Sequence, residues 1–238
     1  MKFVLDTHCH TLASGHAYST IQEMAQHAAA IGFNLIAITD HGPKMPGSTH
    51  LLYFRNLRVI PRKINGVEIL RGVEVNILDH RGKLDIPEDV LKELDMVIAS
   101  FHHPCIKPGS VEENTNTLIN LMKKPYIHMI GHPGNPAYPI NIEKVVAAAK
   151  EYRTLIEINN SSLKPDSFRA GSKENCYKIL EACRDHQVPV AIGSDSHIAF
   201  DIGKFTFAEE MIESLQVPEE LVMNTCADKL KAYINYKE

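Results

Sequence analysis

Histidine is the residue type in this sequence that most needs a chemical explanation. The 238 residues include 13 histidines, against 8 phenylalanines and 8 tyrosines. Because histidine is the commonest metal ligand in proteins and a frequent acid–base residue, this surplus favours chemistry at a site. His8 and His10 are separated by a single residue, as are Asp195 and His197. Residues at this spacing share one face of a strand, so each pair can present both side chains to the same site.

The chain alternates between short β-rich runs and helical patterns from end to end. The β-rich runs are Phe3–Leu5, Leu35–Ile38, Ile69–Val75, Met96–Phe101, Ile127–Ile130, Leu155–Ile158 and Val188–Ile192. The helical patterns cover residues 20–31, 52–60, 87–93, 115–123, 142–151, 173–186, 206–215 and 218–235. Strands separated by helices predict parallel strands joined by right-handed crossovers. The sequence therefore predicts an α/β fold, a distorted TIM-like barrel of seven parallel strands with outer helices, rather than an open sheet.

Histidine, aspartate or glutamate occurs at the end of nearly every β-rich run. The strings concerned are Asp6-Thr7-His8-Cys9-His10, Thr39-Asp40-His41, Gly72-Val73-Glu74, Phe101-His102-His103, Gly131-His132, Glu157-Ile158-Asn159 and Ser194-Asp195-Ser196-His197. The carboxyl ends of parallel strands meet on one face of a barrel, where such folds build their sites. Carboxylates and imidazoles gathered there would be costly unless they are paired or bind metal. We therefore favour a metal site over a structural hydrogen-bonded network.

These strings, taken in order, resemble a known family. Asp6-Thr7-His8-Cys9-His10-Thr11 with His16, Ile38-Thr39-Asp40-His41-Gly42 and Gly193-Ser194-Asp195-Ser196-His197 resemble the PHP (polymerase and histidinol phosphatase) family. Gly72-Val73-Glu74, Ser100-Phe101-His102, Gly131-His132-Pro133-Gly134-Asn135-Pro136 and Glu157-Ile158-Asn159-Asn160-Ser161-Ser162 resemble its YcdX-like stand-alone phosphatase branch. The match runs from residue 6 to residue 197. It implies a distorted seven-stranded barrel that holds three metal ions per subunit, usually zinc, with manganese or iron as alternatives.

The resemblance also implies a ligand for each metal ion. Carried over residue by residue, the first ion would be bound by His8, His10, Glu74 and Asp195. Glu74 would bridge to a second ion, which His102 and His132 would complete. The third ion would be held by His16, His41 and His197. All nine positions carry the residue type that the family expects.

This ligand set implies a metal-dependent phosphoric ester hydrolase, a phosphatase acting on a small phosphomonoester. Metal ions can activate a water molecule near neutral pH and neutralise phosphoryl charge. We expect the attacking water to be metal-bound and held by Glu74, Asp195 and His197. Arg62 and Arg169 are candidates for binding the phosphate group, although each could equally be a solvated surface arginine. The physiological substrate does not follow from the sequence.

Four other residues near the predicted ligands are interpreted as structural or supporting. His103 points away from His102 in an extended strand, and His128 lies four residues before His132, deeper in the barrel. Cys9 opposes its two histidine neighbours in a strand and is predicted to be a packing residue. Asp40 precedes a ligand, where it could support an imidazole or cap a turn.

Other functions stay open at this point. A metal-dependent amidohydrolase also uses His-x-His after its first strand, but it would not need His16, His41 and His197. A phosphodiesterase or nuclease is disfavoured by 25 basic against 29 acidic residues, a net charge of −4. A non-catalytic metal-binding protein would need closed coordination shells. The sequence has no G-x-x-x-x-G-K-[ST] phosphate loop and no G-x-S-x-G elbow, which disfavours ATP-coupled and serine esterase chemistry.

The remaining features of the sequence concern domain organisation, localisation and partners. We find no linker, low-complexity tract or internal repeat and expect a single PHP metal-dependent hydrolase domain over residues 1–238. The five cysteines form no C-x-x-C motif, and we find neither a signal peptide nor a membrane span. These features favour a cytoplasmic protein with a small phosphorylated substrate and no nucleic-acid or membrane partner. The resemblance is compatible with a homo-oligomer, a trimer included.

Overall fold

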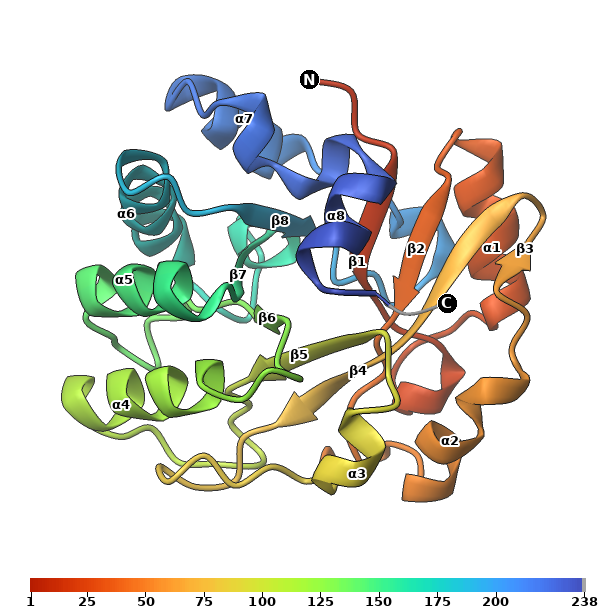
Figure 1. Cartoon of the computed structure of the whole chain (residues 1–238), viewed down its shortest axis with the longest axis horizontal. Coiled ribbons are helices and arrows are strands. Elements are labelled where there is room, and N and C mark those ends of the chain that lie inside the picture. Colours follow the sequence, from red (N-terminus) through yellow and green to blue (C-terminus); the bar gives the residue numbers. More distant parts are fainter. Residues whose placement is uncertain (237–238) are drawn as a thin grey trace.

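Seven parallel strands form a nearly closed barrel, as the sequence predicted. The computed structural model describes residues 1–236. In order around the barrel the strands are β1 (Leu5–Cys9), β2 (Leu35–Ile38), β4 (Val67–Asn76), β5 (Met96–Ser100), β6 (Met129–Ile130), β7 (Leu155–Asn159) and β8 (Val190–Gly193) (Figure 1). The sequence did not predict β3 (Lys63–Ile64), which pairs antiparallel with the start of β4 in a tight hairpin.

Helices follow most strands and cover the outside of the barrel (Figure 1). They are α1 (Ile21–Ala30), α2 (Leu51–Asn56), α3 (Glu88–Leu91), α4 (Val111–Met122), α5 (Ile142–Tyr152), α6 (Ser172–Asp185), α7 (Thr206–Ser214) and α8 (Ala227–Tyr233). Helix α4 begins four residues earlier than predicted because Ser110 and Glu113 form a capping box at its N-terminus. None of the helices within residues 1–236 is long and apolar enough to cross a membrane.

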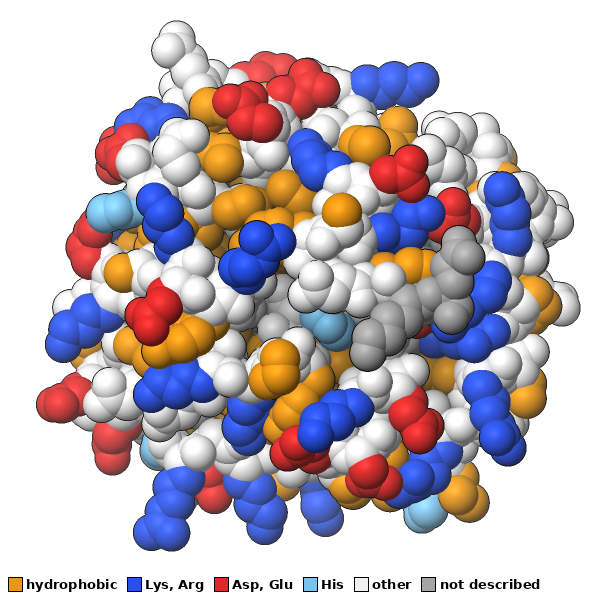
Figure 2. Space-filling view, in the orientation of Figure 1, with side chains coloured by type: hydrophobic (Ala, Val, Ile, Leu, Met, Phe, Trp, Pro, Cys, Tyr) orange, Lys and Arg blue, Asp and Glu red, His pale blue; other side chains and the backbone are white. Residues whose placement is uncertain are grey.

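The amino ends of the strands enclose an apolar floor. One inward-facing residue from each strand contributes to it, namely Leu5, Leu35, Leu70, Met96, Met129, Leu155 and Ala191. Helix α8 closes this end of the barrel because Leu230 and Ile234 pack against the same cluster. On the face that carries α8, basic and acidic side chains are interspersed (Figure 2). The floor is therefore a packed core, and the opposite end of the barrel is left for a site.

The barrel closes between β8 and β1 without a regular ladder of hydrogen bonds. One isolated bridge joins Cys9 to Ser196, and Thr7 Oγ1 donates to the carbonyl of Ile192 at 3.1 Å. The buried side chain of Asn224 spans the rest of the seam. Its Oδ1 accepts from Ile192 N at 2.7 Å, and its Nδ2 donates to the carbonyls of Ile192 and Leu5 at 2.8 and 3.2 Å. An amide thus supplies the donors and acceptor that a strand neighbour would have supplied.

Candidate metal centre

A β-bulge in β1 turns the first two histidines into the barrel. The β1–β2 register shifts between Asp6 and Cys9, so the chain does not keep a strict alternation of faces. Leu5 consequently faces the floor inside the barrel, whereas Cys9 packs outside it against α1 and β2. His8 and His10, which flank Cys9, are fully buried and point to the mouth of the barrel. The packing role predicted for Cys9 agrees with this position.

Strand alternation places most of the remaining candidates inside the same mouth. Glu74 follows Leu70 and Gly72 on the inner face of β4, and His102 continues the inner face of β5. Small residues on the inner faces leave room for these large polar side chains. A methyl group on Gly193, for example, would lie 2.0 Å from Glu157 Oε1 and 2.7 Å from His8 Cβ. Glycine at this position lets two buried polar side chains meet.

Two of the candidate ligands have an unusual backbone conformation. His132 has φ of 30° and Asp195 has φ of 54°, both in the left-handed region that few side chains other than those of Asn and Asp adopt readily. The turn at His132 brings its ring to Glu74 although Gly131 separates it from β6. Such conformations persist where the surrounding structure holds them, and they cluster at functional sites.

Glu74 lies at the centre of the group and contacts histidines through both carboxylate oxygens. Its Oε1 lies 3.2 Å from His102 Nε2 and 2.9 Å from His132 Nε2. Its Oε2 lies 3.5 Å from His8 Nε2, 3.6 Å from His10 Nε2 and 2.7 Å from His41 Nδ1. One fully buried carboxylate therefore faces five imidazoles, and no single hydrogen-bond pattern satisfies all of them.

A second carboxylate, that of Asp195, faces the same Nε2 atoms of His8 and His10. Its Oδ1 is 3.2 Å from His10 Nε2 and 3.7 Å from His8 Nε2. Its Oδ2 accepts from Arg169 at 3.1 Å. His16, His41 and His197 complete the group. The ring of the exposed His16 lies 5.0 Å from that of His41 and 4.7 Å from that of His197, between centroids.

All nine predicted ligands therefore lie in one cluster. Within residues 1–236 there are three sets of residues in which the donor atoms of each set all lie within 4.8 Å of one another. They are His8 with His10 and Glu74, His41 with Glu74 and His102, and His10 with His41 and His197. His41 is placed closer to Glu74 and His10 than the predicted set with His16 implies.

Hydrogen bonds behind the cluster determine which nitrogen of several histidines faces it. His8 Nδ1 donates to Glu157 Oε1 at 2.6 Å, and His102 Nδ1 donates to Asn76 Oδ1 at 2.7 Å. His197 Nδ1 donates to the carbonyl of Asp195 at 2.9 Å. A nitrogen that donates in this way carries the proton, so the Nε2 atom of each ring keeps its lone pair free for the cluster.

The same rule applies to His10 through a serine. Ser14 Oγ donates to Asp40 Oδ1 at 2.7 Å, which leaves Oγ to accept from His10 Nδ1 at 3.0 Å and from His41 N at 3.1 Å. Asp40 also accepts from the backbone and hydroxyl of Thr11 and from Tyr53. Asp40 thus supports an imidazole through Ser14. This supporting role of Ser14, Asn76 and Glu157 was not predicted, although Glu157 lies in a β-rich run.

Several buried atoms of the cluster have no hydrogen-bond partner among the described residues. They are His8 Nε2, His10 Nε2, His41 Nδ1, Glu74 Oε2 and His102 Nε2. Burial would raise the pKa of Glu74, but the charges of His102, His8 and His41 outweigh it and hold that pKa well below its usual range. Burial, with His41 and His197 nearby, holds the pKa of His10 well below its usual range. An ionised carboxylate together with imidazoles such as that of His10, whose ring stays unprotonated, is a donor set that zinc, manganese and iron bind.

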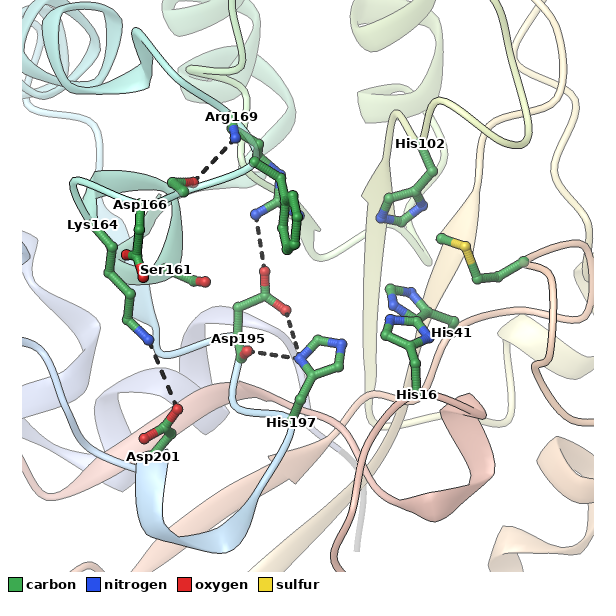
Figure 3. Close-up of a pocket in the computed structure, with 13 residues that line it drawn as sticks. His16, His41, His102, Ser161, Lys164, Asp166, Arg169, Asp195, His197 and Asp201 are labelled. Carbon is green, nitrogen blue, oxygen red and sulfur yellow. Dashed lines mark hydrogen bonds and ion pairs between the residues drawn. The ribbon is translucent and has the colours of Figure 1, made fainter.

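A pocket of about 460 Å³ opens above this cluster. His16, His41 and His102 form one wall, and the segment from Ser161 to Arg169 forms the facing wall (Figure 3). Arg169 lies inside the pocket, as expected of a phosphate-binding residue. The structure does not bring Arg62 there. Arg62 pairs with Asp95, which precedes the first residue of β5, so it lies at the floor end of the barrel.

Comparisons with known proteins agree with this architecture. The family model described as PHP domain matches residues 6–164. A protein named "Probable phosphatase" from Clostridium novyi (strain NT) is 53% identical, and the match covers 100% of this chain and 96% of that protein. A protein of the same name from Thermoanaerobacter sp. (strain X514) is 56% identical, with 100% and 97% covered.

A solved structure shares the fold at low sequence identity. It is the histidinol phosphate phosphatase of Lactococcus lactis in complex with zinc, L-histidinol and phosphate. The TM-score is 0.65 at 19% identity, with 90% of this chain and 94% of that chain covered. The family match over more than half of the sequence and the full-length relatives lead to one conclusion: this chain belongs to the PHP domain family.

Proposed function

We propose that this protein is a metal-dependent phosphatase that hydrolyses a small phosphomonoester. The proposal rests on one observation. The Nδ1 atom donates a hydrogen bond in the rings of His8, His10, His102 and His197, which leaves four Nε2 lone pairs directed at a cluster with two carboxylates. Neutral imidazoles with their outer nitrogen hydrogen-bonded are characteristic of metal ligands. The names of the full-length relatives support phosphatase chemistry at that cluster.

The distances in the cluster suit the first predicted metal ion. Two ligand atoms bound to a tetrahedral zinc ion lie roughly 3.3 Å apart, because each bond is about 2.0–2.1 Å long. The Nε2 atoms of His8 and His10 lie 3.2–3.7 Å from Glu74 Oε2 and Asp195 Oδ1. We propose that these four residues hold one ion, that Glu74 bridges to a second held by His102 and His132, and that His16, His41 and His197 hold a third.

When bound, the metal ions would supply an activated water nucleophile and neutralise charge on the phosphoryl oxygens. The protein contributes the orientation of the substrate. Arg169 Nη1 donates to Asp195 Oδ2 and to Ser162 Oγ, both at 3.1 Å, so its guanidinium is held at the mouth of the pocket. Its remaining N–H groups can bind phosphoryl oxygens.

The experiment that tests this proposal combines metal analysis with a phosphatase assay. Metal content per chain is measured by mass spectrometry after dialysis without chelator, and hydrolysis of p-nitrophenyl phosphate is followed on the same sample. We expect about three metal ions per chain, and activity that chelation removes and added metal restores. Glu74→Gln should lose metal and activity together because it removes the charge that faces five imidazoles.

The matched control is His186→Gln, which changes a surface histidine paired with Glu143 and should leave both readouts intact. Full activity after complete metal removal would overturn the proposal. So would a Glu74→Gln protein that retains wild-type metal content and rate. A metal content near two with intact activity would contradict the proposed third ion at His16, His41 and His197.

A further inference from the structure

The wall of the pocket that faces the histidines carries a second cation. Lys164 lines the pocket on the segment that follows β7, and its side chain is 34% exposed. It lies beyond Asp195 as seen from the histidine wall, on the same wall as Arg169 but nearer to Asp201 (Figure 3). The pocket thus has an inner cation next to the proposed metal ligands and an outer cation at its rim.

The ammonium group of Lys164 makes only a weak contact with another protein group. Its contact is with Asp201 Oδ2 at 3.7 Å, which is too long for a hydrogen bond. Asp201 Oδ1 is meanwhile bound by Lys204 Nζ at 2.8 Å. One carboxylate therefore faces two ammonium groups, and the closer one is Lys204. Lys164 keeps its donors available to a group that enters the pocket.

Arg169 differs in this respect. Two contacts at 3.1 Å, to Asp195 and Ser162, fix its guanidinium beside the metal cluster. Under the proposed function the phosphoryl group to be cleaved lies there. A group at Lys164 would therefore belong to the other end of the substrate, which is the alcohol that leaves.

We propose, building on the proposed phosphatase function, that Lys164 binds a second acidic group of the substrate. The substrates would be phosphomonoesters whose alcohol also carries a carboxylate or a further phosphate. A lysine ammonium recognises either group as a point charge. The exposed Asp166 lines the same wall and would repel such a group. Ligands of opposite charge therefore measure which charge the rim binds more tightly.

The test uses the full chain loaded with metal and phosphonates that cannot be hydrolysed. Isothermal titration calorimetry compares 3-phosphonopropionate with propylphosphonate, which has a methyl group in place of the carboxylate. We expect the carboxylate to tighten binding about fivefold, and Lys164→Met to remove that difference while propylphosphonate binds as before. Lys164→Arg should restore it. Lys173→Met, an exposed lysine outside the pocket, is the matched control and should retain the difference.

Two further ligands define the sign and the source of the effect. 2-Aminoethylphosphonate places an ammonium where the carboxylate was, and it should bind less tightly than 3-phosphonopropionate. Propane-1,3-bisphosphonate tests a second phosphate instead of a carboxylate. Any binding gained through chelation of the metal ions would persist in Lys164→Met, so the variant separates chelation from recognition by Lys164.

The inference is overturned if the ammonium ligand binds best, or if Lys164→Met changes all four ligands equally or none of them. Either outcome leaves the phosphatase proposal intact as long as p-nitrophenyl phosphate, which has no second acidic group, is hydrolysed. Failure to hydrolyse that ester with metal present would instead contradict the proposed function itself.

Discussion

At the scale of single residues, the site depends on groups that would never contact substrate. Glu157 is buried in the middle of β7 and accepts from His8 Nδ1 and from the backbone N–H of His132, both at 2.6 Å. It therefore orients one proposed ligand through its ring and another through its backbone. Burial would lower the pKa of His8, but the charges of Glu157, Glu74 and Asp195 outweigh it and raise that pKa well above its usual range. Binding a cation at Nε2 removes the need for that proton.

Glu157→Gln should weaken metal binding without unfolding the protein. The amide keeps the size of the carboxylate but loses its charge, and it can donate to His8 Nδ1 and so favour the wrong tautomer. Loss of such a supporting partner typically costs about 10–100-fold in metal affinity. Competition with a chelating dye measures the affinity. Glu143→Gln is the control because it alters a Glu–His pair at the surface. Equal affinities in the two variants would refute the orienting role of Glu157.

At the scale of elements, strand alternation predicts most of the site and local exceptions account for the rest. Glu74, His102 and Asp195 continue the inward face of their strands, so their convergence follows from period-two alternation and from the parallel order. The bulge in β1 and the left-handed turn at His132 do not follow from any periodicity. The strand-end pattern identified these residues as candidates, but it did not predict the local backbone that directs their side chains inward. The sequence left Arg62 open between a phosphate-binding and a surface role because its position depends on the β3–β4 hairpin, which was not predicted.

The seam between β8 and β1 should be the place where one polar residue matters most for stability. Asn224→Ala removes the side-chain partner of Ile192 N and of the Leu5 carbonyl, whereas the carbonyl of Ile192 keeps Thr7 Oγ1. An unsatisfied buried group costs about 1–3 kcal/mol, so we expect a loss of about 2–5 kcal/mol in the free energy of unfolding. Urea unfolding measures this loss. Asn120→Ala, on the exposed face of α4, should change it by less than about 0.5 kcal/mol. A comparable loss in the two variants would show that the seam does not depend on Asn224.

The residue that precedes β6 is a histidine that should make stability depend on pH. His128 Nδ1 accepts from Val97 N at 3.0 Å, so the ring must be neutral in the folded protein. Burial lowers the pKa of His128 to about 4 from 6.5. Between these pH values the unfolded chain binds a proton that the folded chain does not, so this contribution to stability is lost as the pH falls from 6.5 towards 4.

The loss attributable to His128 should amount to about 1–3 kcal/mol at pH 4, since each unit of pKa shift corresponds to about 1.4 kcal/mol. The measurement is the difference in unfolding free energy between wild type and His128→Gln across this pH range, which cancels the titration of other groups. The variant should be destabilised at pH 7 and should recover relative to wild type as the pH falls. A difference that stays constant with pH would contradict the assignment.

At the scale of the whole molecule, the barrel is stabilised differently at its two ends. The floor is an apolar cluster that α8 closes through Leu230 and Ile234. The mouth is a cluster of imidazoles and carboxylates drawn from the ends of β1, β2, β4, β5, β6 and β8. The seven-stranded barrel and the position of the mouth followed from the sequence. The closure of the floor by α8 did not, because a helical pattern near the C-terminus does not indicate what its apolar face will contact.

This asymmetry predicts how the protein should respond to metal removal. Among the described residues, one carboxylate oxygen of Glu74 and one ring nitrogen each of His8, His10, His41 and His102 are buried without a hydrogen-bond partner, so the folded state without metal retains these unsatisfied groups at the mouth. A ligand that binds the folded state stabilises it by an amount that grows with its concentration relative to Kd. Chelation should therefore lower the melting temperature, and added zinc should restore it.

Hydrogen exchange should increase at the carboxyl ends of β1, β4 and β5, while amides near Leu5, Leu70 and Leu155 stay protected by α8. Glu74→Gln should show the weakened mouth with or without zinc. Uniform loss of protection along the strands after chelation would mean that the metal cluster, rather than the floor, holds the barrel together.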